Sequence, residues 1–118
     1  MKYDVVLFAN LVKNLGILNS INYFRLHQIS QLMNKIKPEF ALSNIFILNG
    51  LSNYFHENTY PLELMNQICK NIPEEIPKLS NSRLMILLKS FGLSRYSNTE
   101  LYQILVDEVL SRNSSISP

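Results

Sequence analysis

The chain has 118 residues, 47% of them apolar, and a formal net charge of +2 at pH 7. This length fits one domain, no apolar run approaches the roughly 20 residues of a membrane-spanning helix, and the small charge excludes a strongly basic surface over the whole molecule. Cys69 is the only cysteine, which excludes an internal disulfide.

The first third of the chain predicts two helices, at residues 3–15 and 21–36. The run from Val5 to Phe8 is β-prone, but it aligns with helical segments further along the chain. Gly16 follows the first helix, where a left-handed C-cap residue is expected. No secretory signal and no Arg-rich transit peptide is visible at the start of the chain.

The second third predicts helices at 42–55 and 61–72. Pro61 suits the first position of the second helix, and Pro73 ends it. The first helix carries a stripe of apolar residues at helical spacing, namely Ile47, Leu48, Leu51 and Phe55.

The last third predicts helices at 81–91 and 98–112. Gly92 occupies a C-cap position after the first of them. The run from Ser97 to Glu100 has the pattern of a capping box, in which Ser97 accepts a backbone hydrogen bond and Glu100 reaches back. No strand pattern competes with these helices, so the predicted class is all-α.

The second and last thirds repeat one another at a spacing of 37 residues without a gap. Leu42-Ser43-Asn44 returns as Leu79-Ser80-Asn81, while Leu26-His27-Gln28-Ile29 brings the first third into looser register with Leu101-Tyr102-Gln103-Ile104. Such a period predicts an α-solenoid in which each unit packs on its neighbours. We expect one domain over 1–118, with two-helix units at about 3–40, 41–77 and 78–115.

Catalytic and metal-binding motifs are absent from the sequence, which has no GxGxxG, HExxH or CxxC. His27 and His56 fall at different places in their units, so a shared metal site is not expected. Glu74 and Glu75 predict a solvated turn rather than a general acid–base pair. Cys69 is expected to be a small buried apolar residue. The sequence therefore predicts a non-enzymatic protein without metal or cofactor.

Polar residues recur at matching positions of the predicted first helices, and in a solenoid such positions form ladders along one surface. Amides and hydroxyls hydrogen-bond base edges, whereas Lys and Arg hold phosphates. The opposing interpretation is that an A/T-rich genome places Asn and Lys on any solvated face. The candidate RNA-binding residues are Asn10, Lys13, Asn49, Ser52, Asn53, Arg83, Lys89 and Ser90.

One unit carries a pattern known from other proteins. It reads Leu-Met-x-Leu-Leu-Lys-x-Phe-Gly from Leu84 to Gly92, and Glu-Leu-Tyr-x-x-Leu-x-x-Glu-Val from Glu100 to Val109. This pattern resembles the heptatricopeptide and octotricopeptide repeats of organellar RNA-binding proteins, which often accompany a RAP domain; FAST kinase-like proteins carry similar units. The resemblance implies an α-solenoid that contacts organellar RNA. The Asn- and Lys-rich composition fits an apicomplexan parasite.

The predicted first helix is apolar nearly all round, so we expect either further repeats before it or neighbouring protein subunits to cover it. Two functions stay open. The first is a subunit of a mitochondrial ribonucleoprotein, chiefly the mitochondrial ribosome, that contacts ribosomal RNA, with the apicoplast as the alternative organelle. The second is a protein–protein scaffold, or an accessory subunit of another mitochondrial complex, without RNA contact. An unrelated TPR-like array ranks last, because its spacing is about 34 residues and its Trp signature is missing.

Overall fold

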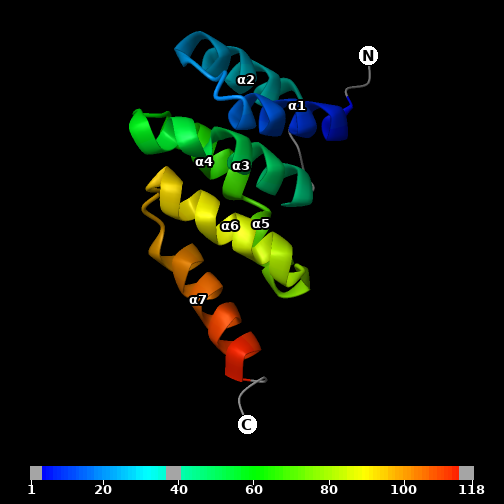
Figure 1. Ribbon diagram of the computed structural model, residues 1–118, viewed down its shortest axis with the longest axis vertical. Coiled ribbons are helices and arrows are strands. Elements are labelled where there is room, and N and C mark those ends of the chain that lie inside the picture. Colours follow the sequence, from blue (N-terminus) through cyan, green and yellow to red (C-terminus); the bar gives the residue numbers. More distant parts are fainter. Residues whose placement is uncertain (1–3, 37–40, 115–118) are drawn as a thin grey trace.

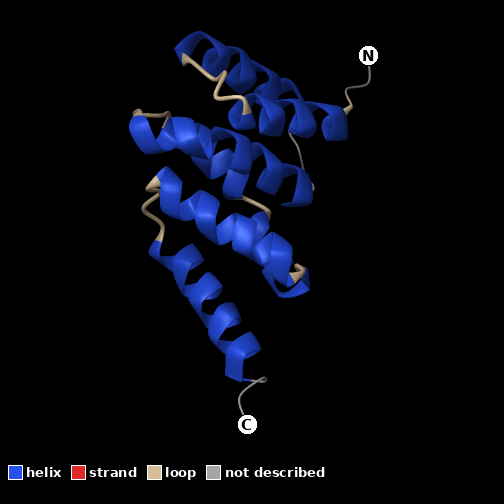
Figure 2. Cartoon of the chain, viewed as in Figure 1, coloured by secondary structure: helices blue, strands red, loops and turns tan. Residues whose placement is uncertain are grey.

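The computed structural model describes residues 4–36 and 41–114, and all regular secondary structure within these residues is helical (Figures 1 and 2). The predicted all-α class is confirmed. Residues 3, 37–40 and 115, which the predicted first helix and unit boundaries include, lie outside the described residues. The elements are α1 (Val5–Ile17), α2 (Tyr23–Ile36), α3 (Ala41–Glu57), α4 (Leu62–Cys69), α5 (Ile72–Glu75), the 3-10 turn η1 (Ile76–Lys78), α6 (Asn81–Ser94) and α7 (Thr99–Ser114).

Four helices begin with a side chain that accepts a hydrogen bond from the first turn. The pairs are Asp4 with the N–H of Leu7, Asn22 with Arg25, Ser80 with Arg83 and Asn98 with Leu101. The last pair corrects the predicted capping box, because α7 begins at Thr99 and Asn98 therefore takes the cap position that was expected for Ser97. Each such cap contributes about 1 kcal/mol.

Two predicted C-caps are wrong. Gly16 and Gly92 lie inside α1 and α6, because both helices continue two or three residues further than predicted. Among the described residues, the left-handed backbone conformation belongs instead to Asn19, with φ of 53°, and Arg95, with φ of 55°. Arg95 is the C-cap of α6, so a non-glycine residue ends this helix.

The helix predicted at 61–72 is divided in two. Pro61 is the N-cap of α4 rather than its first helical residue, and α4 ends at Cys69. A second short helix, α5, begins at Ile72 with Pro73 in its first turn. Proline suits a first turn because the N–H it lacks would have no partner there. Glu74 and Glu75, expected in a turn, belong to α5.

Helix α3 lies between α1 on one side and α6 on the other (Figure 1). It crosses α1 at two glycines, Gly16 and Gly50. A Cβ atom added to Gly50 would lie 2.3 Å from the carbonyl oxygen of Val12, and a Cβ atom added to Gly16 would lie 2.0 Å from the carbonyl oxygen of Gly50. Only glycine allows two helix backbones to approach this closely. The pair therefore determines the spacing of α1 and α3.

The core runs along this row of helices. Because α3 is covered by α1, α4, α5 and α6, its buried residues spread round the helix, and the apolar ones with side chains are Ile45, Ile47, Leu48, Leu51 and Phe55. In α6 the residues Leu84, Leu87 and Phe91 are buried, whereas Met85 is 68% exposed. Met85 occurs 37 residues after Leu48, which is fully buried. The helix face that neighbouring elements cover in α3 is therefore exposed to solvent in α6.

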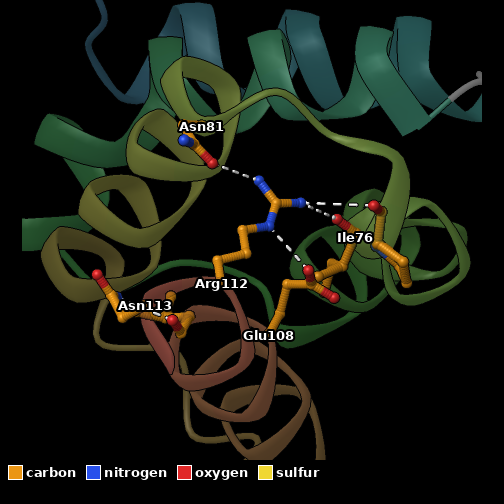
Figure 3. Close-up of polar contacts among 7 residues, drawn as sticks. Ile76, Asn81, Glu108, Arg112 and Asn113 are labelled. Carbon is orange, nitrogen blue, oxygen red and sulfur yellow. Dashed lines mark hydrogen bonds and ion pairs between the residues drawn. The ribbon is translucent and has the colours of Figure 1, made fainter. Parts of the chain in front are cut away.

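Arg112 holds α7 in place, as Figure 3 shows. Its guanidinium donates to Glu108 Oε2 at 2.8 Å, to Asn81 Oδ1 at 2.8 Å and to the carbonyl oxygen of Ile76 at 3.2 Å. These three partners belong to α7, the start of α6 and η1. One planar group thus ties the last helix to two segments that precede it in the chain.

Candidate nucleic-acid interface

The contact between Lys13 and Phe46 joins α1 to α3. The Lys13 Nζ lies over the Phe46 ring, 5.0 Å from its centroid, and both residues are half-buried. At this distance the ammonium is attracted by the ring face. The contact therefore holds a positive charge beside an aromatic ring that is still partly open to solvent.

Two amides continue from Phe46 along α3. Asn49 and Asn53 follow it at i+3 and i+7, which places all three on one face of the helix. Asn49 is half-buried and Asn53 is exposed. Glu57, one turn beyond Asn53, is also exposed and ends this row with a negative charge. The amides thus lie between an ammonium and a carboxylate.

A matching row on α6 brings in a second cation. Arg83, Ile86 and Ser90 have the same i, i+3, i+7 spacing, and the Ser90 hydroxyl lies 3.4 Å from Asn49 Oδ1, within reach of a hydrogen bond. The two rows are therefore neighbours, and Arg83 is exposed at the start of its row. We call the set Lys13, Phe46, Asn49, Asn53 and Arg83 the polar strip.

Ser52 and Ser90 do not belong to this surface, which corrects their prediction as RNA contacts. Ser52 is 2% exposed and Ser90 is 1% exposed. The Ser52 hydroxyl donates to the Asn49 carbonyl oxygen at 2.8 Å, and the Ser90 hydroxyl to that of Ile86 at 2.8 Å. Each serine satisfies its polar group on its own helix and packs as a small core residue.

Asn10 and Lys89 are outside the polar strip. Asn10 lies one helical turn before Lys13 on α1, but its amide is bonded within its own helix. The Asn10 amide donates to the Val6 carbonyl oxygen on α1 at 3.0 Å. Lys89 is exposed and falls one helical turn after Met85, on the uncovered side of α6. The side chain of Lys89 lies about 100° round the helix axis from that of Ser90, because the two residues are consecutive. The eight predicted residues therefore divide into four on the polar strip, two in the core and two elsewhere on the surface.

Sequence reasoning missed Phe46, because an aromatic residue in an apolar helix reads as core. A signal was present, since Arg83 follows Phe46 by 37 residues and was itself a candidate. The match indicates that this position faces outward in both helices.

Two other reactive side chains, those of Cys69 and His56, take part in packing and in a contact between helices. Cys69 is buried, and desolvation raises the pKa of its thiol to about 12. His56 Nδ1 contacts the Leu93 carbonyl oxygen at 3.1 Å, which joins the end of α3 to α6. Within residues 4–36 and 41–114, no group of three or more His, Cys, Asp or Glu is arranged to hold a metal ion. Likewise, none of the helices described is both long and apolar enough to cross a membrane.

Comparison with known proteins gives no relative from which to transfer a function. No protein family, no curated protein and no solved structure matches the chain. The geometry of the polar strip is therefore the main guide to what the protein binds.

Proposed function

We propose that this chain is a non-enzymatic α-solenoid of three two-helix units, with a period near 37 residues, that binds single-stranded RNA. The succession α1, α3, α6 supports the array, because each of these helices packs on the next and each begins a sequence unit. The cap residues support a repeat of about this length, since Asp4 and Asn22 precede Ser80 and Asn98 by 76 residues each, close to two periods.

The polar strip is the observation that carries the proposal. Lys13 and Arg83 supply positive charges for phosphates. The amides of Asn49 and Asn53 supply hydrogen-bond donors and acceptors for base edges. A single strand suits this chemistry better than a duplex, because its unpaired bases are open to side chains. The exposed carboxylate of Glu57 repels phosphates, so the surface that attracts an RNA backbone ends there.

The resemblance to heptatricopeptide and octotricopeptide repeats supports the cellular setting. On this basis we assign the chain to the mitochondrion, as a subunit of the mitochondrial ribosome or a related ribonucleoprotein that contacts ribosomal RNA. Neighbouring protein subunits would cover the exposed apolar residues of α1, which are Val6, Leu7, Leu11 and Ile17.

A binding assay with matched charge reversals tests the strip. Fluorescence anisotropy of a labelled, mixed-sequence single-stranded RNA measures affinity over a series of salt concentrations. Lys13→Glu and Arg83→Glu should each weaken binding and reduce the slope of log K against log salt by about 0.7, the value of one phosphate contact on a single strand. Lys89→Glu is the control, because it makes the same charge change on an exposed face outside the strip. Equal loss in all three variants would show that only net charge matters.

A scaffold without RNA contact is the second candidate function, and the two uncovered ends of the array favour it. Leu7 is 67% exposed on α1, and Met85 and Leu110 are 68% and 62% exposed on α6 and α7. Apolar residues gathered in this way mark protein contacts. If this function holds alone, the chain binds no RNA, and Lys13→Glu leaves its protein partners unchanged.

A further inference from the structure

We propose that Phe46 and Arg83 are the positions on which bases of the bound strand stack, one base on each. The inference rests on the proposed RNA-binding function and adds what holds the bases. It concerns contacts with the flat faces of bases, as distinct from the phosphate and base-edge contacts that the charges and amides of the polar strip provide.

The surroundings of Phe46 are those of a stacking platform. Its side chain is only half-buried, although it belongs to the most enclosed helix of the molecule. Its neighbours on the surface are the Lys13 ammonium and, one turn along α3, the Asn49 amide. Because the ammonium lies over the ring, a base can stack on that face only when Lys13 moves aside. The ring then meets the flat face of the base, while the ammonium and the amide are close enough for its phosphate and its polar edge.

Lys13 covers the ring face at which a base would stack, so its side chain must move aside when the base binds. The attraction between its ammonium and the ring keeps the charge within 5.0 Å of the ring centroid before any ligand arrives. A base that stacks on Phe46 brings its phosphate close to that charge. Lys13 then needs only a change of side-chain rotamer to meet the phosphate.

Arg83 provides the equivalent platform one period later. It takes the position of Phe46 after 37 residues, and its guanidinium is planar, so it stacks on bases as an aromatic ring does. Its side chain is exposed and forms no ion pair with any residue in the described ranges. Two flat groups at one position of neighbouring helices suit consecutive bases, as in helical repeats that read one base per unit.

A single tryptophan reports stacking directly. The chain contains no Trp, so Phe46→Trp gives the only indole emission. Titration with the single-stranded RNA should quench most of this emission. Phe24→Trp is the matched control: Phe24 is 66% exposed on α2, a helix that contributes no residue to the polar strip, and the emission of this variant should stay unchanged.

Two conservative variants separate stacking from charge. Phe46→Leu keeps an apolar side chain in the half-buried position and should weaken RNA binding by about 10-fold, within the range for one base–aromatic contact, with the salt slope unchanged. Arg83→Lys keeps the charge and removes the planar group, so affinity should fall several-fold, again at constant slope. Phe46→Tyr should bind as the wild type does.

The outcomes distinguish this inference from the proposed function. If the wild type binds RNA while Phe46→Trp is not quenched and Phe46→Leu binds normally, stacking is overturned and RNA binding stands. If the wild type binds no single-stranded RNA at all, both are overturned. Circular dichroism of each variant confirms that the helices are intact, so a loss of binding is not a loss of fold.

Discussion

Replacing Gly50 by alanine should destabilise the protein, although the same change in an ordinary helix stabilises it. A Cβ atom at Gly50 would lie 2.3 Å from the Val12 carbonyl oxygen and 2.8 Å from the Cα of Lys13, whereas ordinary contacts begin at 3.4 Å. All the nearest atoms belong to backbone, so no side chain can move aside. Helices α1 and α3 must therefore separate by about 1 Å.

This separation lowers the free energy of unfolding because it loosens the contacts between α1 and α3. Overpacking of this size costs about 1–3 kcal/mol, and a gap of about 1 Å removes up to half of the dispersion energy of the contacts that it opens, including those of the fully buried Val12. Alanine regains about 1 kcal/mol of helix propensity. The lost dispersion energy roughly offsets this gain, so we expect a net loss of about 1–3 kcal/mol and a melting temperature lower by roughly 5 °C or more.

Gly92→Ala is the matched control. Gly92 also lies inside a helix, but a Cβ atom there meets nothing within 4 Å. This variant should gain about 0.5–1 kcal/mol. Thermal and urea unfolding followed by circular dichroism measures both changes. If Gly50→Ala is as stable as Gly92→Ala, α1 and α3 do not cross at this distance, and the reasoning is refuted.

Three further predictions concern stability. Arg112→Leu should cost about 2–3 kcal/mol, because it removes charged hydrogen bonds to α6 and η1, and Arg112→Lys should restore less than half of this loss in urea titrations. Asn98→Ala should cost about 1 kcal/mol in the same assay, whereas Ser97→Ala should change little, since Asn98 is the residue that caps α7; equal effects would restore the predicted capping box. Burial raises the Cys69 pKa from 9.0 to about 12, so above pH 9 the unfolded chain loses a proton that the folded chain keeps. Stability should then fall by about 1.4 kcal/mol per pH unit from this group, and Cys69→Ala should remove that part of the pH dependence.

The helices were largely predictable because their signals are local. Apolar spacing located the main helices, and the all-α class with them, although the segment predicted as one helix at 61–72 is divided into α4 and α5. The other errors lie at helix ends. Asn98 and Ser97 are both good caps, and the sequence does not say which of them the first turn of α7 will use. Gly16 looked like a helix end because its packing role depends on Gly50 in a distant segment.

The candidate site was harder to predict because burial depends on neighbouring helices. A helical wheel of α3 alone shows serine and asparagine as polar, yet Ser52 is buried while Asn53, the next residue, is exposed. Intrahelical bonds such as that from the Ser52 hydroxyl to the Asn49 carbonyl oxygen hide this polarity without any trace in the sequence. For the same reason Phe46 reads as core until the placement of its neighbours is known.

Pull-down of the tagged chain from isolated mitochondria of the source organism, with and without ribonuclease, tests the central claim most directly. Both RNA and protein are identified in the captured material. The proposed function predicts ribosomal RNA fragments together with ribosomal proteins, both lost on ribonuclease treatment and both reduced for Lys13→Glu but not for Lys89→Glu. A set of proteins that resists ribonuclease and is captured equally by all variants would contradict it and leave the scaffold function.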